Sequence, residues 1–318
     1  MLDFEKPIIE LEEEIKRLKD ISASQEPSLR DVQPEIENLE KKLRQTTKKI
    51  FANLTPWQRA QVARHPQRPH TSDYINLLFS DFIELHGDRK FGDDAAIITG
   101  FAKLRERKLV VIGHQKGKDT KENLRYNFGC ANPEGYRKAL RVMKLAERFE
   151  LPIVIFIDTP GAFPGIEAEE RGQAEAIANN IREMFNIAVP ILIFIIGEGG
   201  SGGALGIGIG DKIAILENAY YSVISPEGCA AILWRDRAKA NEAARALKFT
   251  AKDLLALGIV DELIPEPIGG AHRNPEEMSA RIGKKISRYL NELSPFSKDE
   301  LLQRRYEKFR KIGEWEEI

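Results

Sequence analysis

Two apolar runs that each lead into a glycine-rich stretch constrain the fold of this chain more than any other feature. The runs, Pro152–Asp158 and Pro190–Ile196, consist almost entirely of Ile, Val, Leu and Phe. A strand with one solvated face alternates apolar and polar residues, so near-continuous apolar runs are typical of strands buried on both faces of a parallel sheet. Strands are also expected at Leu109–Gly113 and Lys212–Leu216. The pattern predicts an α/β fold in which helices cover a central sheet.

Helices are expected between and after these strands. Asn132 and Pro133 suit the N-cap and the first position of one helix. Its buried face is expected to carry Tyr136, Ala139, Leu140, Met143, Ala146 and Phe149, and its solvated face Arg137, Lys138 and Arg141. Other helices are expected from about Glu167 to Phe185, from Ser225-Pro226-Glu227 onwards, and from Thr250, whose capping box with Asp253 opens a helix that ends near Gly258.

The chain divides into three segments by its pattern of apolar and polar residues. Residues 1–50 predict a helical arm, residues 51–266 an α/β core, and residues 267–318 a helical C-terminal segment. In the arm, Ile8, Leu11, Ile15 and Leu18 recur every three or four residues, and the pattern resumes after a break at Gln25-Glu26-Pro27. Two helices with narrow apolar stripes indicate a hairpin, and their Glu- and Lys-rich outer faces fit either a solvated arm or a docking surface.

Composition narrows the class of protein. The 48 Lys and Arg residues and 49 Asp and Glu residues leave a formal net charge of −1, which provides no global field for nucleic acid or an anionic membrane. Cys130 and Cys229 are too few for a disulfide framework and lack the spacing of a structural zinc site. The N-terminus lacks the features of a secretory signal, and no run approaches the ~18 apolar residues of a membrane span. We expect a cytoplasmic protein with no metal of its own.

The two glycine-rich stretches are the expected site of chemistry. They cover residues 158–165 (Asp-Thr-Pro-Gly-Ala-Phe-Pro-Gly) and residues 197–204 (Gly-Glu-Gly-Gly-Ser-Gly-Gly-Ala), and each connects a buried strand to a helix. Ligands of parallel sheets bind at the carboxyl ends of strands, where helix N-termini present unpaired N–H groups.

The second stretch fits three templates. Gly197, Gly199 and Gly202 spell the G-x-G-x-x-G fingerprint of dinucleotide-binding domains, with Glu217 at a suitable distance for a ribose. The same stretch spells the G-x-S-x-G elbow of serine hydrolases, with Ser201 as nucleophile. The histidine that follows it, His272, lies in a stretch that resembles a surface loop, so the hydrolase has a weak general base.

In the third template the glycines themselves are functional. Without side chains they let a substrate oxygen approach backbone N–H groups, and donors from Gly161-Ala162-Phe163 would complete an oxyanion pocket. This template accounts for both turns and needs no nucleophile. The alternative is that the glycines are structural and permit only tight turns and close packing.

The strings in these turns resemble the α subunit of the bacterial-type acetyl-CoA carboxylase carboxyltransferase. The resemblance extends from about Pro56 to Ile264, and the predicted N-terminal helical pair is also found in that family. It is carried by the two turns and by His86-Gly87-Asp88-Arg89, Gly113-His114-Gln115-Lys116-Gly117, Asn127-Phe128-Gly129, Pro133-Glu134-Gly135-Tyr136-Arg137-Lys138-Ala139, Glu169-Glu170-Arg171-Gly172-Gln173 and Tyr221–Ala230. One departure is Phe163, which stands where tyrosine is common.

The resemblance implies a crotonase-like fold of repeated β-β-α units in a spiral. It also implies transfer of a carboxyl group from carboxybiotin to acetyl-CoA, giving malonyl-CoA for fatty acid synthesis. Carried over by motif, backbone groups at Gly161, Ala162, Gly202, Gly203 and Ala204 would hold the ureido oxygen of biotin. Substrate contacts are also expected from Phe163, Gly200, Ser201, Lys116 and Lys118.

The resemblance further implies a larger, ATP-dependent complex. A β subunit with a four-cysteine zinc ribbon would bind the acyl-CoA carbonyl and assemble with this chain as an α2β2 heterotetramer. Carboxybiotin would be presented by the biotin carboxyl carrier protein, with biotin carboxylase in the same complex, so that no cofactor is covalently bound to this chain.

Four charged positions near the turns have two interpretations each. Asp158 and Glu198 end buried strands, so they would either orient a loop or transfer a proton, and we favour the former. Lys116 and Lys118, in a basic stretch that continues to Lys121 and Arg125, would either contact substrate phosphates or an acidic carrier domain, or remain solvated.

Overall fold

The computed structural model describes residues 2–23 and 32–313, so the break predicted at Gln25-Glu26-Pro27 lies outside it. At its centre is a mixed sheet of eight strands in the order β1-β2-β3-β4-β5-β6-β8, with β7 paired to β5. The first three strands pair antiparallel, and all pairs from β3 onwards are parallel. The strands are β1 (Ser80–Glu84), β2 (Ile97–Leu104), β3 (Arg107–His114), β4 (Ile153–Thr159), β5 (Ile191–Gly200), β6 (Lys212–Leu216), β7 (Tyr220–Ser222) and β8 (Glu262–Ile264).

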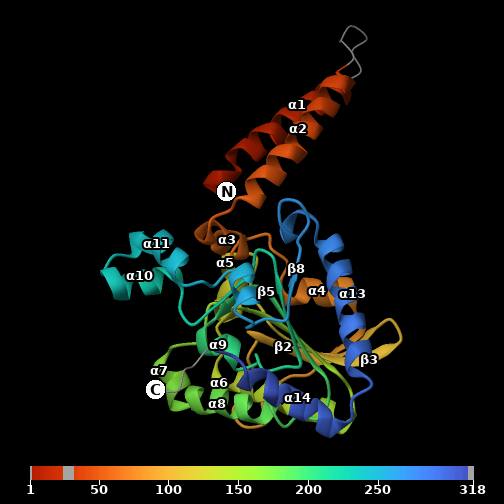
Figure 1. The fold of residues 1–318 in the computed structure, drawn as a ribbon, viewed down its shortest axis with the longest axis vertical. Coiled ribbons are helices and arrows are strands. Elements are labelled where there is room, and N and C mark those ends of the chain that lie inside the picture. Colours follow the sequence, from red (N-terminus) through yellow and green to blue (C-terminus); the bar gives the residue numbers. More distant parts are fainter. Residues whose placement is uncertain (1, 24–31, 314–318) are drawn as a thin grey trace.

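Helices surround this sheet and add a projecting arm to it (Figure 1). The α-helices are α1 (Lys6–Ala23), α2 (Gln33–Ala52), α3 (Pro56–Ala63), α4 (Thr71–Leu78), α5 (Thr120–Arg125), α6 (Pro133–Arg148), α7 (Ile166–Glu170), α8 (Gln173–Met184), α9 (Ser201–Leu205), α10 (Pro226–Trp234), α11 (Ala240–Ala246), α12 (Ala251–Ala256), α13 (Pro275–Leu293) and α14 (Lys298–Arg310). Every residue of β4 and β5 is buried, so both faces of these strands are covered. The predicted α/β fold with a central sheet is confirmed.

The four predicted strands are confirmed as β3, β4, β5 and β6. In the parallel pair of β4 and β5, Ile155 lies beside Ile193 and Phe156 beside Phe194, so large apolar side chains are in register across the centre of the sheet. This register also brings the carboxyl ends of the two strands, and the glycine-rich turns that follow them, to the same edge.

The predicted helix starts are confirmed as well. Helix α6 begins at Pro133 after Asn132. At α10 the Ser225 hydroxyl accepts a hydrogen bond from Gly228 N–H at 3.0 Å, and the capping box of Thr250 and Asp253 opens α12.

Two helix predictions are wrong in detail. The helix expected from Glu167 to Phe185 is two helices, α7 and α8, because Gly172 between them has a left-handed φ of 81° that ends one helix before the next begins. Phe149, expected on the buried face of α6, is 60% exposed, because it follows the last turn and packs edge-on against Phe101.

The charged face of α6 is also not solvated as predicted. Lys138 is 1% exposed, and its Nζ donates to Asp93 and to the Asp94 carbonyl at 2.5 and 2.7 Å. Arg137 Nε donates to Asp88 at 2.7 Å, and Arg141 Nε donates to the Gly87 carbonyl. The segment from Gly87 to Asp94 therefore folds over this face and supplies the oxygens that burying a cation requires.

The N-terminal helices form the predicted hairpin. Ile8, Leu11 and Ile15 of α1 are buried, as is Ile36 of α2, and the pair projects from the body as the red and orange arm of Figure 1. At its base Ile8 joins an apolar cluster with Phe51, Leu54 and Val62. The segment boundaries at residues 50 and 266 stay predictions.

Candidate active site

The two glycine-rich turns are in direct contact at the carboxyl ends of β4 and β5, where Thr159 lies beside Gly199. A Cβ atom on Gly200 would lie 2.2 Å from the carbonyl oxygen of Pro160, and one on Gly203 would lie 2.4 Å from the carbonyl carbon of Gly161. Heavy atoms cannot approach so closely, so only glycine allows the two backbones to meet here. The sequence-predicted site residues of both turns are therefore brought together.

The turns differ in which N–H groups remain free. Gly161 N–H donates to the Thr159 hydroxyl at 3.1 Å, and Phe163 N–H donates to the Ala131 carbonyl at 3.0 Å. Between them, Ala162 N–H has no acceptor within the described part of the chain. Gly202 and Gly203 lie in the first turn of α9, where N–H groups have no partner within the helix. Ala162, Gly202 and Gly203 thus carry the N–H groups left without an acceptor at the turns among the described residues, and Gly203 among them is buried.

One non-glycine residue in these turns has an unusual backbone conformation. Ser201 has a φ of 52°. A non-glycine residue at positive φ is uncommon, and such residues gather at functional sites. This conformation fits the view that the turns are shaped for a ligand.

An apolar cavity of about 310 Å³ opens beside Ser201. The exposed Ser201 lines it together with Leu205, Tyr221, Val223 and Phe309. Ala204 is fully buried and Phe163 half-buried, so neither presents a whole side chain to solvent.

A cluster of buried charged side chains lies next to the turns, at the carboxyl ends of β4 and β5. Lys116 Nζ donates to Asp158 at 2.7 Å and to Glu198 at 2.6 Å, and Glu198 N–H donates to Asp158 at 3.0 Å. His70 Nδ1 lies 3.0 Å from the second oxygen of Asp158. The carboxylates thus hold the ends of β4 and β5 together through one lysine, and the solvated interpretation of Lys116 is wrong.

The charges of Lys116, Asp158 and Glu198 are fixed near neutral pH. Burial alone disfavours each charged form, but the pairing outweighs burial, so the pKa of Lys116 is raised and the pKa values of Asp158 and Glu198 are lowered. Burial lowers the pKa of His114, on the same edge of the sheet, to about 3. None of these groups is suited to exchange a proton near pH 7.

Besides His70, sequence reasoning missed three members of the cluster. Arg64 Nε donates to Glu198 at 2.6 Å, Arg64 also pairs with Glu227, and the Tyr220 hydroxyl donates to Glu198. Arg64 follows α3 and is 134 residues from Glu198 in sequence, so no local pattern links them. Glu227 was visible only as part of a helix start.

The cluster forms one wall of a cleft of about 640 Å³, which Pro160, Phe128 and Lys118 also line. Lys118 is more exposed than Lys116, and its Nζ donates to Asp73 at 2.6 Å. The cleft and the apolar cavity therefore flank the glycine turns.

The other two templates for Gly197–Gly203 lack their required partners. Ser201 makes no hydrogen bond to any histidine among the residues that the structure covers. His272, expected in a surface loop, is instead buried, with 2% of its side chain exposed, and stacks on His65. Gly197 and Gly199 lie inside β5, whereas the dinucleotide fingerprint requires them in a turn that opens a helix.

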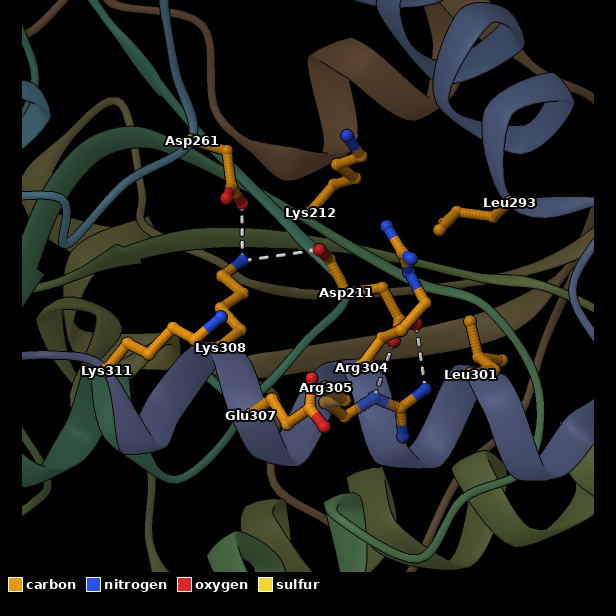
Figure 2. Close-up of a pocket in the computed structure, with 10 residues that line it drawn as sticks. All are labelled: Asp211, Lys212, Asp261, Leu293, Leu301, Arg304, Arg305, Glu307, Lys308 and Lys311. Carbon is orange, nitrogen blue, oxygen red and sulfur yellow. Dashed lines mark hydrogen bonds and ion pairs between the residues drawn. The ribbon is translucent and has the colours of Figure 1, made fainter.

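A separate cavity of about 330 Å³ lies under α14 (Figure 2). Its charges are largely paired within the protein: Arg305 binds Asp211 through two nitrogens, and Lys308 binds Asp261. The residues around this cavity therefore serve mainly to hold α14 against the rest of the protein.

Comparison with known proteins identifies the family. A family model described as acetyl co-enzyme A carboxylase carboxyltransferase-like matches residues 1–313. The acetyl-coenzyme A carboxylase carboxyl transferase subunit alpha of Geobacter metallireducens is 55% identical over 316 residues, which are 99% of this chain and 98% of that protein. The subunit of the same name from Bacillus cereus is 57% identical over 313 residues, 98% of this chain and 96% of that protein.

Solved structures agree with the fold. Transcarboxylase 12S, with methylmalonyl-coenzyme A and methylmalonic acid bound, has a TM-score of 0.59 at 21% identity, covering 72% of this chain and 42% of that one. The β subunit of Pseudomonas aeruginosa geranyl-CoA carboxylase has a TM-score of 0.55 at 17% identity, covering 78% of this chain and 46% of that one. The likeness shows a crotonase-type carboxyltransferase fold.

No helix within residues 2–23 and 32–313 combines the length and apolarity needed to cross a bilayer.

The family match, the identity over nearly the whole chain and the fold all point to one family. The chain belongs to the acetyl-coenzyme A carboxylase carboxyltransferase family, as a relative of its α subunits.

Proposed function

We infer that this chain is the α subunit of an acetyl-CoA carboxylase carboxyltransferase, which moves a carboxyl group from carboxybiotin to acetyl-CoA and forms malonyl-CoA. The observation that carries this inference is identity of 55% or more to named α subunits over nearly the whole chain. The enzyme works as a multisubunit complex that includes a β subunit.

The glycine turns supply the electrostatic part of this reaction. When the bond between the carboxyl group and the biotin nitrogen breaks, negative charge moves onto the ureido oxygen of biotin. The free N–H groups of Ala162, Gly202 and Gly203 are the donors for that oxygen. Donors fixed before the reaction stabilise the developing charge without reorganising, which makes such pockets effective.

Proton transfer needs no side chain of this subunit. Biotin, when bound at the turns, would itself supply the base for the methyl proton of acetyl-CoA. The carbanion that forms then attacks the released carbon dioxide. This agrees with the site, where Lys116, Asp158 and Glu198 are engaged with one another and serve to hold the two turns in place.

The partners follow from the same assignment. The β subunit, with its zinc ribbon, would hold the acyl-CoA carbonyl, and the biotin would arrive on its carrier protein. The apolar cavity beside Ser201 fits the hydrocarbon part of biotin, because Leu205, Tyr221 and Val223 offer it apolar contacts. An α2β2 assembly, working with biotin carboxylase, completes the proposal.

Replacing Gly203 tests the role of the turns. In Gly203→Ala the new methyl group would lie 2.5 Å from Ala162 N, so the two turns must separate and the donors move. Loss of one oxyanion donor costs about 10²- to 10³-fold in rate. We expect a loss of this size in malonyl-CoA decarboxylation with free biotin, measured in the complex with the β subunit.

Gly92→Ala is the matched control, because a methyl group there meets no atom within 4 Å. Thermal unfolding and complex formation of both variants separate loss of activity from loss of structure. A folded Gly203→Ala complex with full activity would contradict the site. Ser201→Ala distinguishes the hydrolase, which it would inactivate, from the carboxyltransferase, which it would leave largely active.

A further inference from the structure

Three side chains with metal-binding chemistry meet where the N-terminal arm joins the core. Glu5 lies in the short 3-10 helix before α1, His65 follows α3, and His272 lies in the short 3-10 helix before α13. A carboxylate oxygen of Glu5 and a ring nitrogen of each histidine all lie within 4.8 Å of one another. The two imidazole rings stack with their centroids 3.9 Å apart.

The polar atoms of this cluster are buried without partners. The side chains of Glu5 and His272 are 3% and 2% exposed. Glu5 Oε1 and both ring nitrogens of His272 have no hydrogen-bond partner among the residues described. The distance of 3.8 Å between Glu5 Oε1 and His272 Nε2 is too long for a hydrogen bond. Since an unsatisfied buried polar group costs about 1–3 kcal/mol, this concentration of such groups points to a missing ligand.

The donor set identifies the class of ligand. Two imidazoles and one carboxylate form a common ligand set for zinc, with bonds of about 2.0–2.2 Å. Imidazole binds a metal in its neutral form. We propose that Glu5, His65 and His272 bind a divalent transition metal, with zinc the expected ion, which fastens the N-terminal arm to the core.

Binding requires small local movements. The three donor atoms must approach one another to fit around one ion, and the stacked rings of His65 and His272 must turn so that their nitrogen lone pairs converge on it. Gln67 N–H donates to His65 Nδ1 at 3.2 Å, so binding through Nε2 moves the ring proton to Nδ1 and gives up this contact. Three protein ligands leave the fourth position of a tetrahedral zinc site to water.

This site uses none of the glycine-turn residues and is distinct from the zinc ribbon of the β subunit, although His65 also lines the cleft beside the turns. It also departs from the sequence-based expectation that this chain binds no metal, which rested on the two cysteines. No sequence pattern links its three residues, because Glu5 and His272 are 267 positions apart (272 − 5). The ion would join the first turn of the arm to the segment that precedes α13.

Metal binding by the untagged, full-length chain without the β subunit tests the proposal. After removal of metal with EDTA, the chain is dialysed against Zn²⁺ and its zinc content is measured by mass spectrometry. Co²⁺ provides a spectroscopic probe, because a four- or five-coordinate cobalt site absorbs visible light. We expect one equivalent of zinc per chain and a cobalt spectrum that zinc abolishes by displacement.

Variants locate the ion. Glu5→Gln and His272→Gln should weaken binding by more than roughly tenfold, since even an outer-shell partner contributes about 10- to 100-fold to metal affinity. His86→Ala, which removes an exposed histidine, and Glu12→Gln, which removes the partner of Arg273 in the arm, should bind zinc like the parent. Circular dichroism checks that each variant is folded. If His272→Gln does not fold, Glu5→Gln, which preserves the shape of the side chain, still tests the site.

The role of the ion has its own measurement. Zinc should raise the melting temperature of the parent chain and slow proteolytic cleavage of the arm, and should do neither in Glu5→Gln. A parent chain that binds no zinc or cobalt, and whose melting temperature EDTA leaves unchanged, would overturn the proposal.

Discussion

At the residue scale, the fold depends on ion pairs that lie entirely inside the protein. Arg68 and Glu266 are the clearest, with side chains 1% and 0% exposed and nitrogen-to-oxygen distances of 2.6 and 3.1 Å. Glu266 also accepts hydrogen bonds from Asn218 and Ala271, and Arg68 Nε donates to the Ile196 carbonyl. The pair therefore connects the segment after α3 to β5 and to the segment after β8.

The Arg68–Glu266 pair predicts a loss of stability in acid. Burial alone raises the pKa of Glu266, but the Arg68 guanidinium outweighs burial and lowers it to about 2. The pKa of a glutamate in an unfolded chain is about 4.3. Because the folded value is lower, this group stabilises the protein fully above about pH 5 and progressively less as the pH falls towards about 2.

The free energy of unfolding of Glu266→Gln, measured with urea at pH 7 and at pH 3, tests this. We expect a loss of about 3–5 kcal/mol at pH 7, because Arg68 loses its buried partner. The difference in free energy of unfolding between variant and parent should be smaller at pH 3. Glu106→Gln, at an exposed turn, is the control. A difference that is the same at both pH values would contradict this account.

Residue-level prediction from sequence succeeded for glycine and failed for charge. Gly200 and Gly203 could be recognised because a run of glycines has few explanations other than close backbone approach. Lys116 and Lys138 could not be recognised as buried, because their carboxylate partners lie 42 to 82 positions away in the chain. A charged side chain is buried here only where residues distant in sequence supply its hydrogen bonds. A local sequence pattern does not reveal these partners.

At the element scale, one buried arginine, Arg305, makes most of the polar contacts of α14, and Lys308 adds an ion pair to Asp261 (Figure 2). Arg305 is 1% exposed and binds Asp211 through two nitrogens at 2.8 Å. It also donates to the carbonyls of Met184, Ile187 and Val189, at 2.7, 2.7 and 2.9 Å. One side chain thus provides hydrogen-bond donors to carbonyl groups at the end of α8 and in the loop that leads into β5.

Replacing this arginine should detach the helix. Arg305→Met leaves a buried aspartate and three carbonyls without their donor, and removal of one partner from a buried pair costs about 3–5 kcal/mol. Arg304→Met, on the exposed face of the same helix, should change stability by less than about 1 kcal/mol. Urea unfolding of both variants measures the difference. Equal stability of the two variants would show that α14 is held by apolar packing alone.

Elements with strong periodic patterns could be predicted from sequence, and weaker ones could not. Strands β4 and β5 were visible because both of their faces are apolar. β1, β2, β7 and β8 were not. β1 is mostly exposed, Thr99, Gly100 and Lys103 interrupt the apolar pattern of β2, and β7 and β8 have three residues each. The break between α7 and α8 was missed because a single glycine inside a helical pattern is often tolerated, and only its left-handed φ reveals the end of the helix.

At the scale of the whole molecule, the site exists because the parallel sheet brings two turns to one edge. Sequence reasoning could place both turns after buried strands, but the pairing of β4 with β5 follows from topology. The charge cluster and the proposed metal site also join segments that only the folded chain brings together. In the proposed function the N–H groups of the turns serve only the biotin side of the reaction, so we expect a second subunit to bind the acyl-CoA.

Reconstitution tests this central claim most directly. Malonyl-CoA decarboxylation in the presence of free biotin is measured with this chain alone, with a zinc-ribbon β subunit from the same cell alone, and with the two mixed. The account predicts activity in the mixture and in neither subunit by itself. Activity from this chain alone, or a stable complex with no activity, would contradict it.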